Sequence, residues 1–144
     1  MKQGFTLIEI FTIIGIIVVF SFVVAPVFRS YGPSLSLSGA VRELVTDCRY
    51  AQQMAITEQN EYCLKFFPVE KKYQVLKCGS QTIIKEKILS SQIQSLTLSG
   101  LVNDEARYNP YGAVSQSGDV VLENIKNETK TISIKPSGFV EIVD

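Results

Sequence analysis

The sequence predicts an α+β fold, in which a long N-terminal helix packs on a small antiparallel β-sheet domain. Three observations predict it. The chain begins with a long apolar run, and the segment after it repeats apolar residues with the period of a helix. The remainder alternates apolar and polar residues in short runs separated by turn residues, as strands do. A length of 144 residues suits one anchor and one small core.

Residues 5–28 form the apolar run, and Glu9 is its only charged residue. Because about 20 apolar residues cross a bilayer as a helix, we expect a transmembrane anchor helix over this range. Only Met1-Lys2-Gln3-Gly4 precedes the run, which is longer than the core of an ordinary secretory signal. From these residues alone, an uncleaved signal anchor with Lys2 on the cytoplasmic side and a processed N-terminus are both open.

The helix is expected to continue beyond the anchor, through residues 29–58. Pro26 lacks a backbone N–H and predicts a kink. Residues 30–34 contain a glycine and a proline and predict a second kink or a short break.

An apolar stripe follows, with residues at steps of three or four: Leu37, Val41, Leu44, Cys48, Ala51 and Ala55. It predicts an amphipathic helix laid on a sheet, with a coiled-coil seam as the alternative. Cys48 lies on the stripe and is expected to be a buried free thiol. Several polar residues fall off the stripe: Arg42, Glu43, Asp47, Gln53 and Glu58.

Residues 59–144 predict a β-rich globular domain, which opens with a hairpin over 62–67 and 73–78. Aligning Leu64 and Phe66 with Val75 and Tyr73 places Cys63 and Cys78 together on the other face. A disulfide between them fits that geometry, while free thiols or a bond to Cys48 remain open. Further strands are expected at 83–89, 93–98, 118–122, 131–135 and 137–142.

Composition argues against catalysis and against nucleic-acid binding. Basic and acidic residues balance at 14 each, so no basic field is available to hold nucleic acid. The chain has no histidine, the commonest general base and metal ligand. The charges at 70–72 and 103–105 are interpreted as solvated loops. We therefore expect no catalytic residue, no metal and no cofactor.

The hexapeptide Gly4-Phe5-Thr6-Leu7-Ile8-Glu9 resembles the processing site of type IV prepilins and pseudopilins. In that family a prepilin peptidase cuts after the glycine and methylates the new N-terminal residue. The resemblance implies a leader peptide over 1–4, cleavage between Gly4 and Phe5, and N-methylation of Phe5. It gives Glu9 a role in assembly and extends to Pro26, because pilin anchors often carry proline there.

A physical argument supports a partner for Glu9. A carboxylate inside a membrane helix costs roughly 2.5–3.5 kcal/mol on insertion scales. Cleavage would release the amine of Phe5, whose pKa lies near 7.7–8 by type. Phe5 and Glu9 are an i, i+4 pair in one chain, and the same groups of staggered neighbours could pair in an apolar filament core. The alternative is a carboxylate that reaches back to the cytoplasmic headgroups.

The C-terminal part resembles the H-type minor pseudopilins of type II secretion and the FimT-like minor pilins. Gly118 and Gly138 match the glycines that precede the closing strands in that family. On the helix, five residues match its pattern: Leu44, Arg49, Ala51, Ala55 and Ile56. FimT-like members implicated in DNA uptake carry arginines around the last glycine-led strand. Here that strand carries Glu141, which puts DNA binding in doubt.

The resemblance implies a minor pilin or pseudopilin, a structural subunit built into a type IV pilus or a type II secretion pseudopilus. Its expected partners are the prepilin peptidase, other pilin or pseudopilin subunits, the inner-membrane assembly platform and the membrane. The alternatives are a major pilin and a subunit of a DNA-uptake pilus. The expected location is a single pass of the inner membrane, with the C-terminal domain outside the cytoplasm.

Overall fold

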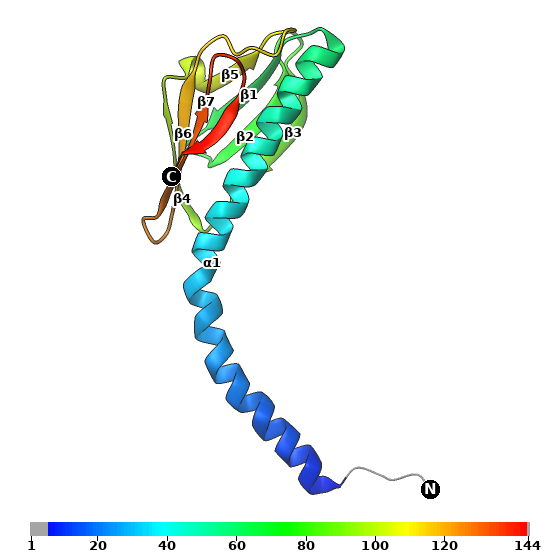
Figure 1. Cartoon of the computed structure of the whole chain (residues 1–144), viewed down its shortest axis with the longest axis vertical. Helices are drawn as coiled ribbons and strands as arrows, with labels where there is room; N and C mark the ends of the chain where they lie inside the picture. Colours follow the sequence, from blue (N-terminus) through cyan, green and yellow to red (C-terminus); the bar gives the residue numbers. More distant parts are fainter. Residues whose placement is uncertain (1–5, 144) are drawn as a thin grey trace, which may run out of the picture. The chain divides into compact units, whose positions relative to one another are not determined.

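A computed structural model describes residues 6–143, without the side chains of residues 25 and 27–29. The chain divides into two compact units, Met1–Gly32 and Pro33–Asp144, and each is described by itself. The described elements are one α-helix, one short 3-10 helix and eight strands (Figure 1).

Helix α1 runs from Leu7 to Glu58 and contributes to both units. It is one element through residues 30–34, so of the two outcomes expected there the short break is wrong. Pro26 also lies within the helix, and the kink expected at this residue stays a prediction.

The strands form two antiparallel sheets in the Pro33–Asp144 unit. Sheet A has the order β3-β2-β1-β5, and sheet B has the order β4-β6-β7-β8. The bounds in sheet A are β1 Tyr62–Phe67, β2 Lys72–Lys77, β3 Thr82–Ile88 and β5 Glu105–Tyr108. Those in sheet B are β4 Ile93–Ser99, β6 Gly118–Asn124, β7 Thr129–Ile134 and β8 Val140–Val143. The α+β prediction is confirmed, with two small sheets on the helix.

The first hairpin has the predicted register. Leu64 lies opposite Val75, and Phe66 lies opposite Tyr73. These four side chains belong to the main core, because alternation along a strand sends them all to the face that meets α1.

The core lies between the helix stripe and the inner faces of both sheets. All six stripe residues are at most 1% exposed, from Leu37 to Ala55. They share one cluster with Tyr62, Tyr73 and Tyr108 of sheet A and with Val120, Leu122, Ile132 and Ile134 of sheet B. The coiled-coil alternative is therefore wrong for this stripe, since the chain's own sheets cover it. Burying each large apolar side chain contributes about 1.5–3 kcal/mol.

Candidate functional site

The N-terminal part of α1 is apolar and uncovered. The segment Leu7–Val24 spans 18 residues with a mean hydropathy of 2.8, and none of it is buried within the structure. An apolar surface of this extent is stable only against lipid or other apolar helices. The segment therefore fits a membrane anchor.

Glu9 lies in the first turn of α1, and its side chain is exposed. Thr6 opens the helix, because its carbonyl oxygen accepts a hydrogen bond from the backbone N–H of Glu9 at 3.1 Å. No basic residue occurs between Glu9 and Arg29 in the sequence. Since 20 helical residues span about 30 Å, the basic residues that follow cannot reach this carboxylate along the helix. Gly4 and Phe5 lie outside the described residues.

Two hydroxyl groups of the anchor are satisfied within the helix. Thr12 Oγ1 donates to the carbonyl oxygen of Ile8 at 2.9 Å, and Ser21 Oγ donates to that of Ile17 at 2.8 Å. Such internal bonds let a hydroxyl enter an apolar medium at small cost. Glu9 is thus the charged residue of the Leu7–Val24 segment.

The globular unit contains a buried carboxylate that corrects one prediction. Asp47 was expected on the polar face of the helix, yet it is 3% exposed. Its Oδ2 accepts a hydrogen bond from the Tyr73 hydroxyl at 2.7 Å, and its Oδ1 pairs with Lys85 Nζ at 2.7 Å. Burial, followed by this bond to Asp47, raises the pKa of Tyr73 far above its ordinary value. No local sequence pattern indicates that Asp47 is buried, because its cover comes from strands β2 and β3.

The same edge of the unit carries a second ion pair. Lys87 Nζ lies 2.8 Å from Glu43 Oε1, and Lys85 lies 3.9 Å from the same carboxylate. Lys85 and Lys87 alternate along β3, so both reach the helix. Together these pairs hold β3 against α1.

The three cysteines have separate environments. Cys63 and Cys78 are joined in a disulfide with a Cα–Cα distance of 5.5 Å, which leaves no bond to Cys48. They lie with Leu76 in a small cluster apart from the main core. Cys48 is a free, buried thiol, as predicted. Burial raises its pKa to about 12, so it stays protonated near neutral pH.

Two turns near the end of α1 are held by one side chain. Gln52 Nε2 donates to the carbonyl oxygen of Gly112 at 2.8 Å and to that of Ser137 at 3.4 Å. Gly138 has a φ of +81°, which favours glycine. A Cβ at Gly138 would also collide with the Gly112 carbonyl and with Gln52. Position 138 thus requires glycine for two reasons, the positive φ of the turn and the closeness of the Gln52 side chain on α1.

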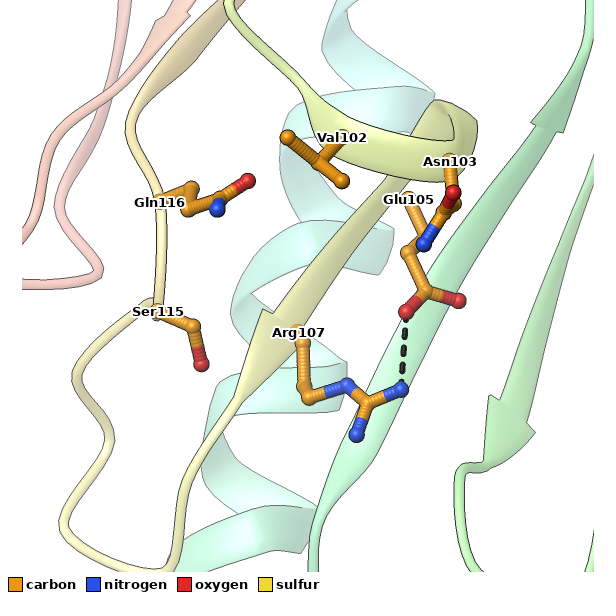
Figure 2. A pocket seen from close by; sticks show the side chains of 6 residues that line it. All are labelled: Val102, Asn103, Glu105, Arg107, Ser115 and Gln116. Atoms are coloured by element: carbon orange, nitrogen blue, oxygen red, sulfur yellow. Dashed lines mark hydrogen bonds and ion pairs between the residues drawn. The ribbon is translucent and has the colours of Figure 1, made fainter.

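A polar pocket beside β5 shows no catalytic arrangement (Figure 2). It lies between β5, the short 3-10 helix Val102–Asp104 and residues 115–116. Arg107 at its centre pairs with Glu105 at 2.8 Å and with Glu61 at 3.3 Å, which neutralises the guanidinium. Glu105, expected in a loop, is the first residue of β5. Among residues 6–143 no group of three or more His, Cys, Asp or Glu side chains could hold a metal ion.

Comparison with known proteins gives a likeness of structure. No family model matches the sequence, and no curated protein sequence matches it. The type IV minor pilin FimU of Pseudomonas aeruginosa is similar over 75% of this chain and 88% of its own, with 13% identity and a TM-score of 0.62. The minor pseudopilin EpsH from the Type 2 Secretion System of Vibrio cholerae is similar over 75% and 96%, with 9% identity and a TM-score of 0.64.

Both similar structures are those of structural subunits rather than enzymes. The chain therefore has the pilin-like fold shared by type IV minor pilins and minor pseudopilins.

Proposed function

We propose that this chain is a minor pilin or pseudopilin that is cut between Gly4 and Phe5, methylated on Phe5 and assembled into a filament. The observation that carries the proposal is the exposed carboxylate of Glu9 on an otherwise apolar, uncovered helix. A charge in that position needs a cationic partner once the helix leaves water.

Processing supplies the cation. The new amine of Phe5 would stand four residues before Glu9, and the two groups would lie on one helix face. In a bundle of such helices the amine of one subunit pairs with the carboxylate of its neighbour. Low polarity strengthens the pair, and a misplaced neighbour leaves a buried charge unpaired. The pair would therefore set the register of subunits.

The proposed partners are the prepilin peptidase, other pilin or pseudopilin subunits and the inner-membrane assembly platform. Lys2 before the anchor favours a cytoplasmic N-terminus, because positive residues stay on that side. The Cys63–Cys78 disulfide favours an oxidising compartment for the globular unit. We infer a single-pass inner-membrane protein whose globular unit lies outside the cytoplasm.

The similar structures favour a minor subunit over a major pilin, since FimU and EpsH are both named as minor subunits. A DNA-uptake role is disfavoured at the last strand. There Glu141 pairs with Lys135 at 2.8 Å, which uses the nearest positive charge.

The experiment compares the wild-type chain with Gly4→Leu, using Gln3→Leu as the matched control. The wild-type and control proteins should yield a mature N-terminus at methylated Phe5 by mass spectrometry and should co-purify with sheared filaments. Gly4→Leu should keep Met1 and remain in the membrane. An intact Met1 on wild-type subunits within filaments would show the proposal to be wrong.

A further inference from the structure

Three large apolar side chains are exposed around the point where α1 enters the globular unit. The unit begins at Pro33, and Leu35 of the helix is 75% exposed. Ile88 at the end of β3 is 66% exposed and lines a cavity with Ser36 of α1. Ile125 in the turn between β6 and β7 is 51% exposed. We call Leu35, Ile88 and Ile125 the apolar rim.

The turn that carries Ile125 is held in place by a buried amide. Asn124 is 0% exposed, and its Oδ1 accepts hydrogen bonds from the backbone N–H groups of Lys126 at 2.9 Å and Glu128 at 3.0 Å. Its Nδ2 donates to Glu128 Oε2 at 2.6 Å. A hydrogen bond from Ser34 of α1, followed by the one from Asn124, lowers the pKa of Glu128. The turn therefore has a fixed place beside the start of the helix, and it presents Ile125 to solvent on a hydrogen-bonded support.

The rim follows the membrane anchor closely along the chain. The apolar run ends at Phe28. Tyr31 is 69% exposed and is of the residue type that collects at the depth of the lipid headgroups. Ser34 comes three residues later, which is about 4.5 Å along a helix. This distance depends only on the continuity of α1, so the start of the globular unit is within reach of the headgroups at any orientation of that unit.

The charges nearest to the rim come in pairs of opposite sign. Lys126 lies near Glu128, and Lys87 pairs with Glu43 at 2.8 Å. These pairs neutralise each other, so the rim attracts a partner by its apolar side chains rather than by charge. Exposed apolar side chains of this kind bind at the boundary between headgroups and acyl chains, because the bilayer removes their surface from water.

We propose that, in the subunit that is not yet assembled, the apolar rim lies in the headgroup region of the bilayer that holds the anchor of the same chain. The inference goes beyond the proposed function by giving the globular unit a lipid contact, and it rests on the membrane location proposed there. It does not depend on cleavage after Gly4 or on Glu9. The contact must break when the subunit leaves the membrane for a filament.

Fluorescence quenching by labelled lipids tests this contact in the full chain. Ser91 is exposed in the turn between β3 and β4. It precedes Gln92, whose carbonyl oxygen accepts a hydrogen bond from the Ile125 N–H at 3.0 Å. A small dye on Ser91→Cys therefore reports on the rim without replacing any of its residues. The three native cysteines are buried or bonded to each other, so the introduced cysteine is the accessible thiol.

The labelled chain is reconstituted in vesicles of phosphatidylethanolamine and phosphatidylglycerol that contain a lipid with a spin-labelled headgroup. The protein is kept too dilute for chains to meet, so that quenching reports on lipid alone. The dye at position 91 should lose at least about half of its fluorescence, because it lies at the depth of the quencher. No loss at this low protein density would overturn the proposal, and a loss that appears only at high density would indicate a contact between chains instead.

Tyr111→Cys is the matched control. Tyr111 is 89% exposed and lies beside the end of α1, where Gln59 donates to the carbonyl oxygen of Pro110 at 3.4 Å. That end is about 36 Å along the helix from Ser34. A dye at position 111 should keep its fluorescence, and equal quenching at positions 91 and 111 would contradict a contact made by the rim.

Paired substitutions then test the apolar character of the contact. Ile88→Glu with Ile125→Glu should reduce quenching at position 91 to the level of the control, because two carboxylates do not enter the boundary of the acyl chains. Ile88→Leu with Ile125→Leu should preserve it. Quenching that is the same in the Glu pair and the wild type would contradict the proposal. Labelling of one thiol per chain, with Cys48 still protected, shows that a variant is folded, and resistance of the chain to alkaline extraction tests the membrane location separately.

Discussion

The Tyr73 hydroxyl on β2 donates a hydrogen bond of 2.7 Å to the Asp47 carboxylate on α1, and both residues are at most 3% exposed. Lys85 on β3 pairs with the other carboxylate oxygen. One acid thus ties the helix to two strands. A buried charge held in this way destabilises the fold strongly once its partners are removed. Loss of the half-exposed Glu43–Lys87 pair costs less, because water can solvate the remaining charge.

Asp47→Ala should destabilise the globular unit by about 2–4 kcal/mol, because the Tyr73 hydroxyl and Lys85 lose their partner. Glu43→Ala, the matched control, should cost less than about 1 kcal/mol. The measurement is urea unfolding of the full chain in detergent, followed by circular dichroism. Equal losses of unfolding free energy for the two variants would contradict the argument that burial makes the Asp47 interactions stronger than the Glu43–Lys87 pair.

Alkaline pH should weaken the fold in part through Cys48. Burial raises the pKa of this thiol from 9.0 to about 12, so the folded state keeps a proton that the unfolded state releases. Its contribution is complete below about pH 9 and is lost as the pH rises towards 12. Stability measured against pH should fall less steeply over this window for Cys48→Ala. Part of the decrease of stability with pH should remain in this variant, because the pKa of Tyr73 is also raised in the folded state.

Reduction should lower stability without abolishing the fold. The Cys63–Cys78 bond closes a loop with a sequence separation of 15, for which about 3 kcal/mol is expected. Non-reducing peptide mapping of protein from its native envelope should show the bond, and reductant should lower the urea midpoint. The double variant Cys63→Ser, Cys78→Ser should be insensitive to reductant. Free thiols at both positions in native protein would refute the bond.

Gly138→Ala should cost about 1–3 kcal/mol, because the residue has a positive φ and its Cβ would strike Gln52 and the Gly112 carbonyl. Gly79→Ala is the control, since a Cβ there meets nothing within 4 Å. Thermal melts of the two variants should separate clearly. Similar melting temperatures would contradict this prediction and would mean that Gln52 can move away from the added Cβ at little cost in stability.

Glu9→Gln should separate insertion from assembly. The variant removes the charge and keeps the shape, so the anchor should insert at least as well as the wild type. Incorporation into filaments should fall, because the Phe5 amine of a neighbour would stay unpaired. Membrane fractionation and co-purification with filaments measure the two effects, with Ser21→Ala as a control whose hydroxyl bonds within its own helix.

Normal incorporation of Glu9→Gln would contradict the pairing. A subunit at the filament tip is a special case, since no subunit lies above it and it could tolerate the change. Loss of incorporation would therefore place this chain below at least one other subunit.

The helix stripe and the register of the first hairpin could be predicted from the sequence, because both depend on local periodicity. The helix stripe from Leu37 to Ala55 and the pairing of Leu64 with Val75 both follow from apolar residues repeating at a fixed step. Burial of Asp47 could not be predicted in this way, because its cover comes from β2 and β3, more than twenty residues further along. The one available signal was Lys85 and Lys87 alternating on the same strand.

Strand β5 and the role of Gly138 were missed for related reasons. Glu105-Ala106-Arg107-Tyr108 is short and carries two charges, so its pattern is that of a loop, and only pairing with β1 makes it a strand. In the sequence, Gly138 is recognisable only as a glycine before a strand. The space beside it is filled by Gln52 of the packed helix, which no local pattern encodes.

The bond from Gln52 to Ser137 joins residues that are 85 positions apart. During synthesis from the N-terminus, the apolar stripe of α1 would be made long before its last covering strand, β8. Contacts between residues so far apart in the sequence form slowly, because a long loop must close first. The nascent subunit would thus be anchored at its N-terminal helix while the core of its globular unit is still incomplete. At this stage it would be most susceptible to proteolysis.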